Sequence, residues 1–336
     1  MQERYERKRV MPRVIAVTSG KGGVGKSNFV LNVGISLAMM DTRVQILDAD
    51  LGLANLDVLM GIKSHSTLED VIFGKQDLND IIIETDYKVE LIPGCSGTQD
   101  MADLSKEQIQ DLVKKVSRGS KEADCLLVDT AAGISTGVIS FLMAVPEVIV
   151  GVSSEPTSLT DAYALIKVLK KNGYSGRISM FSSMVKNSAS GHMIYKKIAS
   201  AARRFLDIPV GFLGSVYYDE KLTRAVTDQV PAIVRFPTSN ISRCYRVIAL
   251  TLLGQNSVQT DYDKFWTRLV NMITKGPKAK TVKAVEFKGH NGEGTIEDTI
   301  HNILDEQRRT RFLLERILAT IEHDADSSCS KQPLPL

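Results

Sequence analysis

The sequence has no long hydrophobic run, few cysteines and almost no excess of one charge over the other. No run of about 18 apolar residues occurs, and a helix needs roughly that length to cross a bilayer. The four cysteines are scattered and form no C-x-x-C pair, which argues against a zinc or iron–sulfur site and fits a reducing compartment. They are Cys95, Cys125, Cys244 and Cys329.

Charge is balanced as well: 42 basic and 39 acidic residues leave a net charge of +3. Such a balance argues against nucleic-acid binding through bulk charge. Residues 1–12 are expected to form a mobile charged arm, and no apolar signal-peptide core follows the first residues. With 43% hydrophobic residues in a chain of 336, we expect a globular cytoplasmic protein with a sizeable core.

One glycine-rich stretch, GKGGVGKS at residues 20–27, stands out from this ordinary composition. It matches the phosphate-loop pattern, in which Lys26 would reach the β- and γ-phosphates of a nucleotide and Ser27 would hold Mg²⁺. An apolar strand at 14–17 precedes it and a helix at 28–40 is expected to follow, so backbone N–H groups and the helix dipole would form an anion site. The alternative is a glycine-rich turn without a ligand. The expected phosphate-loop contacts are Gly20, Lys21, Gly22, Gly23, Val24, Gly25, Lys26, Ser27 and Asn28.

Strands and helices alternate from residue 13 to residue 255, which predicts one α/β domain. Its sheet is expected to be twisted and mostly parallel, with helices on both faces, as in a P-loop NTPase. Two expected strands, 43–48 and 124–129, end in aspartate, so Asp48, Asp50 and Asp129 would lie at the edge where such sheets bind ligands. Asp129 ends an apolar run of Walker B form and would act near Mg²⁺, although an aspartate here could also cap the next helix.

The character of the sequence changes after residue 257. Residues 262–275 predict an amphipathic helix with the spacing of one that lies on a membrane, or else packs on the core or a partner. Residues 276–336 are expected to hold a linker, a helix at 296–321 and a disordered tail. The side chains expected to enter the membrane are Phe265, Trp266, Leu269, Val270 and Ile273.

Three motifs in this order resemble those of the deviant-Walker ATPases of the MinD/ParA family, whose loop reads KGGVGK followed by Ser or Thr. The resemblance covers residues 13–255 and includes DADLGLANLD at 48–57 and LVDTAAGI at 127–134 as the two switches. Within the family, residues 154–167 look most like the flagellar-number branch, FlhG/FleN.

The resemblance implies a slow, Mg²⁺-dependent ATPase that forms a homodimer around ATP. Lys21 would contact phosphate on the partner's nucleotide, with a solvated surface lysine as the alternative. Asp50 would position the attacking water, and Asp48 and Asp129 would act near Mg²⁺. Asn187 occupies the place of an adenine-contacting asparagine, or else is a turn residue at a strand end.

The flagellar branch implies a switch that regulates flagellar number or placement and cycles onto the anionic inner-membrane surface. Its partners would include flagellar basal-body or regulatory proteins and an FlhF-like GTPase. Residues 1–12 show no clear copy of the motif that stimulates this GTPase, and the extension beyond residue 276 departs from the branch. The alternatives are a ParA-like nucleoid-binding partition ATPase or another MinD-type spatial regulator, and no specific nucleic-acid partner is expected.

Overall fold

A computed structural model describes residues 13–50, 56–72, 75–94, 123–256 and 265–267. The chain divides into two compact units, Met1–Lys278 and Ala279–Leu336, and all of the described residues belong to the first. The expected arm at 1–12 and the helix at 296–321 therefore lie outside the described residues, as does most of the helix at 262–275.

An eight-stranded sheet in the order β3-β4-β2-β5-β1-β6-β7-β8 forms the centre of the domain. All neighbours pair in parallel except β3, which runs antiparallel to β4 at the edge. The strands are β1 Arg13–Ser19, β2 Val44–Ala49, β3 Ile83–Glu84, β4 Val89–Ile92, β5 Cys125–Thr130, β6 Glu147–Ser153, β7 Arg177–Val185 and β8 Val210–Tyr217. The predicted α/β fold with a mostly parallel sheet is confirmed.

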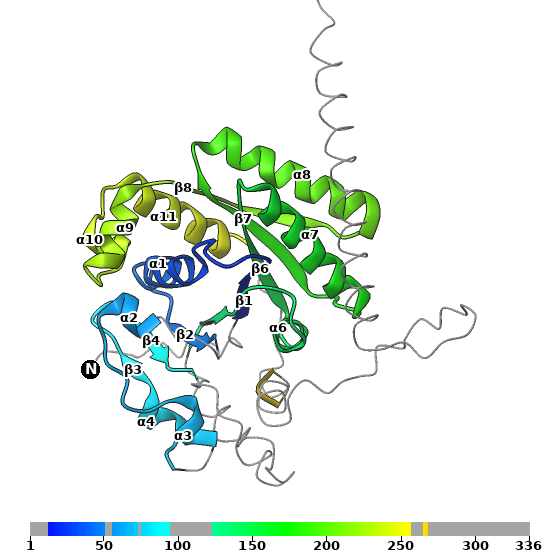
Figure 1. Cartoon of the computed structure of the whole chain (residues 1–336). Helices are drawn as coiled ribbons and strands as arrows, with labels where there is room; N and C mark the ends of the chain where they lie inside the picture. The colour runs from blue at the N-terminus through cyan, green and yellow to red at the C-terminus, as the bar shows by residue number, and fades with distance from the viewer. Residues whose placement is uncertain (1–12, 51–55, 73–74, 95–122, 257–264, 268–336) are drawn as a thin grey trace, which may run out of the picture. The chain divides into compact units, whose positions relative to one another are not determined.

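Helices cover both faces of this sheet (Figure 1), with α1 and α11 on one side and α6, α7 and α8 on the other. The longer helices are α1 Lys26–Ala38, α6 Thr136–Leu142, α7 Pro156–Lys171, α8 Ser188–Leu206, α9 Glu220–Thr227 and α11 Asn240–Leu253. The short ones are α2 Leu56–Met60, α3 Leu68–Ile72, α4 Leu78–Ile81 and α10 Ala232–Arg235.

Helix α1 is held on its face of the sheet by aromatic stacking and by a buried amide. Phe29 stacks on Phe181 of β7 with ring centroids 3.9 Å apart, and both side chains are buried. Asn32, also fully buried, accepts a hydrogen bond from the backbone N–H of Ile233 in α10 at 2.8 Å. A buried amide is stable only when it is hydrogen-bonded, so this contact fixes α1 and the loop before it.

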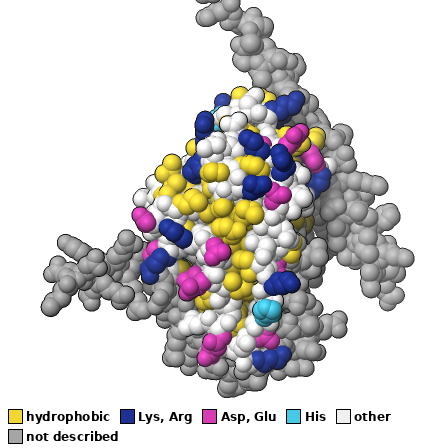
Figure 2. All heavy atoms as spheres, turned by 90° about the vertical axis from the view of Figure 1, so that its left-hand side faces the viewer, with side chains coloured by type: hydrophobic (Ala, Val, Ile, Leu, Met, Phe, Trp, Pro, Cys, Tyr) yellow, Lys and Arg dark blue, Asp and Glu magenta, His cyan; other side chains and the backbone are white. Residues whose placement is uncertain are grey.

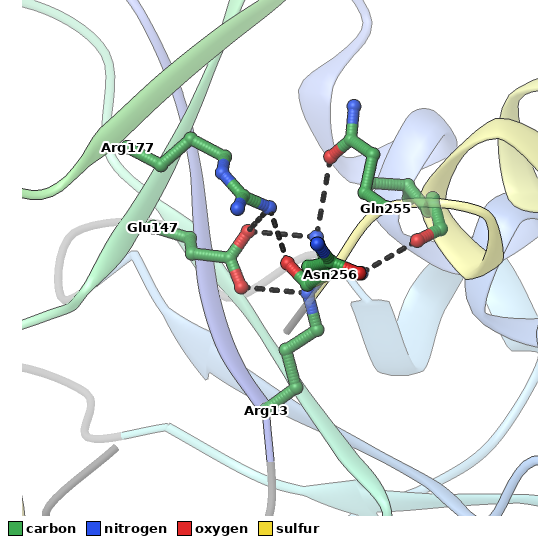
Figure 3. A network of polar contacts seen from close by, with 6 residues as sticks. Arg13, Glu147, Arg177, Gln255 and Asn256 are labelled. Carbon is green, nitrogen blue, oxygen red and sulfur yellow. Dashed lines mark hydrogen bonds and ion pairs between the residues drawn. The ribbon is translucent and has the colours of Figure 1, made fainter. Parts of the chain in front are cut away.

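The amino ends of β1, β6 and β7 are joined by an ion-pair network (Figure 3). Glu147, only 3% exposed, receives Arg13 through two hydrogen bonds of 2.6 and 2.7 Å and Arg177 at 3.4 Å. The same arginines bind the chain after α11, at the carbonyls of Leu252 (2.6 Å) and Asn256 (2.7 Å). The chain therefore leaves α11 at the end of the sheet opposite its carboxyl edge.

The outer surface of α9, α10 and α11 is partly apolar (Figure 2). Aliphatic side chains that are 37–57% exposed lie on these three helices, and exposed apolar side chains gathered on one face are typical of a contact surface. They are Val226, Val234, Val247, Leu250 and Leu253.

Candidate nucleotide-binding site

The glycine-rich loop lies between the carboxyl end of β1 and the first turn of α1, as predicted. Gly23 and Gly25 have φ of 77° and 88°, which side chains rarely tolerate, and Gly25 is the residue that precedes α1. Gly20 is packed closely, because a Cβ there would lie 2.3 Å from the backbone of Asp161 in α7. The loop is thus shaped by its glycines, and it opens at a helix N-terminus, where anions bind.

Lys26 is the first residue of α1 and is only 9% exposed. Its charge acts on the carboxyl group of Asp129 and lowers the pKa of that group. An ammonium group in this position, at the mouth of a phosphate-shaped loop, is suited to hold a polyphosphate.

Asp48 and Asp129 lie side by side, since β2 and β5 pair them directly in register. Both are buried, at 3% and 2% exposure. Asp48 accepts hydrogen bonds from the backbone N–H groups of Asp50 (3.1 Å) and Leu56 (3.3 Å). The carboxylates predicted from the two strand ends are therefore brought together.

The pKa of Asp129 is raised to about 7, and burial is the largest cause. The charges of Asp48 and Asp50 also raise this pKa, whereas a hydrogen bond from the Ser27 side chain and the charge of Lys26 lower it. Its Oδ1 atom has no hydrogen-bond partner among the described residues. A buried oxygen without a partner, beside the Ser27 hydroxyl and the paired Asp48, matches the oxygen ligands that Mg²⁺ prefers. These residues fit a magnesium ion bound with a nucleotide.

The second switch is attached directly to the end of β1. The backbone N–H of Gly133 donates to the Ser19 carbonyl at 2.8 Å, and the Thr130 hydroxyl donates to the Val17 carbonyl at 3.0 Å. Gly133 has φ of 100°, and Ile134 beside it is 41% exposed. These contacts tie the end of β1, directly before the phosphate loop, to the segment that leads into α6, which begins at Thr136.

Lys21 is not simply solvated, although its side chain is 42% exposed. Its Nζ donates to Glu155 and, at 3.3 Å, to the hydroxyl of Thr157 at the start of α7. Its charge also lowers the pKa of Asp161, which burial raises. Sequence reasoning missed Glu155 and Thr157 as partners, because Lys21 and Glu155 are 134 positions apart in the sequence.

Asn187 acts as the N-cap of α8 in this structure: its Oδ1 accepts from the backbone N–H of Ser190 at 2.9 Å. This contact matches the turn alternative, and the adenine contact stays a prediction. The burial of Phe265 (1% exposed) and Trp266 (0%) runs against the exposed face expected of a membrane helix. Leu269, Val270 and Ile273 lie outside the described residues.

Phe265 packs edge-on against Phe141 of α6, with ring centroids 6.3 Å apart, and against Trp266 at 5.0 Å. Residues 265–267 are helical. In this conformation Phe265 faces α6, and both aromatic side chains are buried. Among the described residues, no helix is long and apolar enough to cross a membrane.

The strand, glycine loop and helix, with an aspartate on the neighbouring strand, define a P-loop nucleotide-binding domain. A family sequence model described as "ParA: NUBPL iron-transfer P-loop NTPase" matches residues 10–253. This chain belongs to the ParA/MinD family of P-loop ATPases.

Two relatives carry flagellar names. The antiactivator FleN of Pseudomonas aeruginosa is 43% identical over 237 residues, which cover 70% of this chain and 85% of FleN. The flagellum site-determining protein YlxH of Helicobacter pylori is 34% identical over 218 residues, 65% of this chain and 74% of YlxH.

A solved structure of the septum site-determining protein MinD from Pyrococcus horikoshii, complexed with Mg-ADP, has the same fold. It superposes with a TM-score of 0.58 at 24% identity and covers 71% of this chain and 95% of its own. At that identity the likeness concerns the fold alone.

Proposed function

We propose that this chain is an ATPase switch that dimerises around ATP, cycles onto a membrane and regulates flagellar number or placement. The observation that carries the proposal is the 43% identity to FleN over 237 residues. The phosphate loop and the paired carboxylates Asp48 and Asp129 support it. YlxH, named as a flagellum site-determining protein, supports the same pathway.

The chemistry follows from the positions of the side chains. Lys26 and the loop N–H groups would hold the phosphates, while Ser27, Asp48 and Asp129 would hold Mg²⁺, directly or through water. Bound Mg²⁺ would neutralise charge on the phosphates. Asp50, whose backbone is fixed by Asp48, would position the attacking water.

Dimerisation would depend on Lys21. In the single chain this lysine is held by Glu155, and at the dimer interface it would exchange that carboxylate for phosphate on the partner's nucleotide. A lysine supplied by a second copy neutralises charge as an arginine finger does, so formation of the dimer would require the triphosphate.

Membrane binding would require Phe265 and Trp266 to leave their buried positions. Phe141, which Phe265 contacts, belongs to α6 directly after the second switch, so the nucleotide state can act on this contact. Each copy of a dimer would expose one such aromatic pair. A dimer with two pairs would bind a lipid surface far more tightly than a monomer with one pair.

Two variants with opposite expected effects test this proposal by co-sedimentation of the full chain with anionic vesicles. Phe141→Ala removes the packing partner of Phe265 and should raise vesicle binding without ATP. Trp266→Ala removes an anchor and should lower vesicle binding with ATP. Both side chains are buried, so a general loss of folding would move both variants the same way. Equal binding by wild type and both variants would contradict the proposal.

A further inference from the structure

The last turns of α7 and α8 carry exposed basic side chains. Lys170 and Lys171 end α7, and Arg203 and Arg204 lie near the end of α8. Arg203 pairs with Asp207 at 3.5 Å, whereas Lys170, Lys171 and Arg204 make no ion pair with any described residue. Three positive charges are therefore available to a ligand.

The topology places these three charges at one end of the domain. Helix α7 returns from the carboxyl end of β6 to the amino end of β7, and α8 returns in the same way to β8. The two helices pack side by side (Figure 1), so both of their basic ends lie at the amino edge of the sheet. The nucleotide site lies at the opposite edge.

The other arginines at the same edge are already neutralised. Arg13 and Arg177 bind the buried Glu147, and Arg43 pairs with Asp124 at 2.9 Å. Helix dipoles favour a basic residue in a last turn. They do not account for an exposed aromatic ring beside the charges: Phe205 is 45% exposed, and the Arg204 Cζ lies 5.3 Å from its ring centroid.

The chain leaves α11 at this same edge, because Arg177 holds the Asn256 carbonyl. Phe265 then contacts α6, on the face of the sheet that also carries α7 and α8. The described chain after α11 therefore reaches the same edge of the sheet as the unpaired basic side chains. Basic residues beside an exposed aromatic ring are the combination that meets anionic headgroups.

We propose that Lys170, Lys171, Arg204 and Phe205, here called the basic end, form a second membrane contact that binds anionic phospholipid headgroups in addition to the C-terminal anchor. This inference rests on the proposed membrane-cycling function. Three charges next to an aromatic anchor suit a lipid surface better than a nucleic acid, whose binding requires many phosphate contacts. The basic end would orient the domain with its nucleotide edge away from the membrane.

The test uses the full chain with Mg²⁺ and a non-hydrolysable ATP analogue, and phosphatidylcholine vesicles with or without phosphatidylglycerol. The triple variant Lys170→Gln, Lys171→Gln, Arg204→Gln should bind the anionic vesicles about a hundredfold more weakly than wild type at low salt. The matched control neutralises three exposed basic residues at the nucleotide end of α9 and α11: Lys221→Gln, Arg224→Gln and Arg243→Gln. It should bind like wild type, and all three proteins should bind neutral vesicles equally.

Each result decides between the two proposals. Wild-type binding by the triple variant, with binding still lost in Trp266→Ala, would overturn the basic end and leave the proposed function standing. Equal losses in the triple variant and the control would mean a bulk-charge effect and also overturn it. The same proteins are also tested for binding to duplex DNA. A triple variant that binds vesicles like wild type but loses binding to DNA would assign the surface to nucleic acid instead. Absence of wild-type binding to any vesicle would remove the proposed membrane cycle and this inference together.

Discussion

The two ends of the sheet each bury a carboxylate, and the two carboxylates differ in their hydrogen-bond partners. At the amino end, Glu147 is 3% exposed and is surrounded by two arginines in hydrogen-bonding contact. At the carboxyl end, Asp129 is 2% exposed, has one oxygen without a partner among the described residues, and has its pKa raised to about 7. Two carboxylates of equal burial thus have different roles: the first joins strands, and the second is set to receive a ligand.

The largest loss of folding stability should come from removing Glu147, the buried carboxylate that pairs with two arginines at the amino end. Glu147→Ala leaves two arginines near the sheet without their carboxylate, and loss of one partner of a buried ion pair costs about 3–5 kcal/mol of unfolding free energy. Urea unfolding of the nucleotide-free protein measures it. The exposed residue Glu155, replaced by Ala, serves as control; equal stabilities of the two variants would contradict the comparison.

Removal of the buried carboxylate at the carboxyl end should raise the free energy of unfolding, whereas removal of Glu147 should lower it. Asp129→Asn removes a buried carboxylate, so the magnesium- and nucleotide-free variant should be more stable than wild type at pH 8, by about 1–4 kcal/mol.

The pH dependence follows from the raised pKa of Asp129. Between the unfolded value near 3.8 and the folded value of about 7, the folded state binds more protons, so wild-type stability falls as pH rises through this window. The contribution of Asp129 to the stability of the folded state is complete below its unfolded-state pKa, and it is lost above pH 7. Urea midpoints of wild type and Asp129→Asn that keep a constant difference from pH 4 to pH 8 would show that Asp129 is not perturbed.

A third prediction concerns ligand binding at the carboxyl end. Lys26→Ala removes a charge-assisted contact to phosphate and should weaken binding of Mg-ATP on the order of a hundredfold. Calorimetric titration measures this affinity, with Lys167→Ala on the exposed surface of α7 as control. An affinity equal to that of wild type would refute the phosphate-loop assignment.

The smallest effect should come from Glu155, which holds Lys21 within one chain. An exposed ion pair contributes about 0–1 kcal/mol, so Glu155→Ala should tighten ATP-dependent dimerisation by up to about fivefold. Asp228→Ala, which breaks the exposed Asp228–Arg235 pair, is the matched control in sedimentation experiments. Weaker dimerisation by Glu155→Ala would mean that this carboxylate supports the interface instead.

The sheet and the phosphate loop were predictable because local signals carry them. Alternating apolar strands and helices predicted the parallel core, and the loop motif put Lys26 and Ser27 at the junction with the following helix, where α1 begins. The edge strand β3, only two residues long, and the short helices α2 and α4 gave too little periodicity to detect. The sequence also did not show that Arg13 and Arg177 both bind Glu147, because these residues lie 134 and 30 positions from it in the sequence.

The segment at 262–275 shows where pattern alone is ambiguous. Aromatic residues at helical spacing serve equally well to bind a lipid surface or to pack on a protein, and Phe265 and Trp266 do the second in this structure. A protein that exchanges one contact for the other uses the same apolar face twice, so the sequence cannot separate the two states.

The central claim is that a nucleoside triphosphate bound at the carboxyl end of the sheet makes two copies of the chain form a dimer. Sedimentation velocity of the wild-type protein, with Mg²⁺ and a non-hydrolysable ATP analogue at concentrations well above its affinity, tests this most directly. We predict a dimer with the analogue, and a monomer with ADP and for Lys21→Ala with the analogue. A wild-type protein that stays monomeric with saturating analogue would contradict the account.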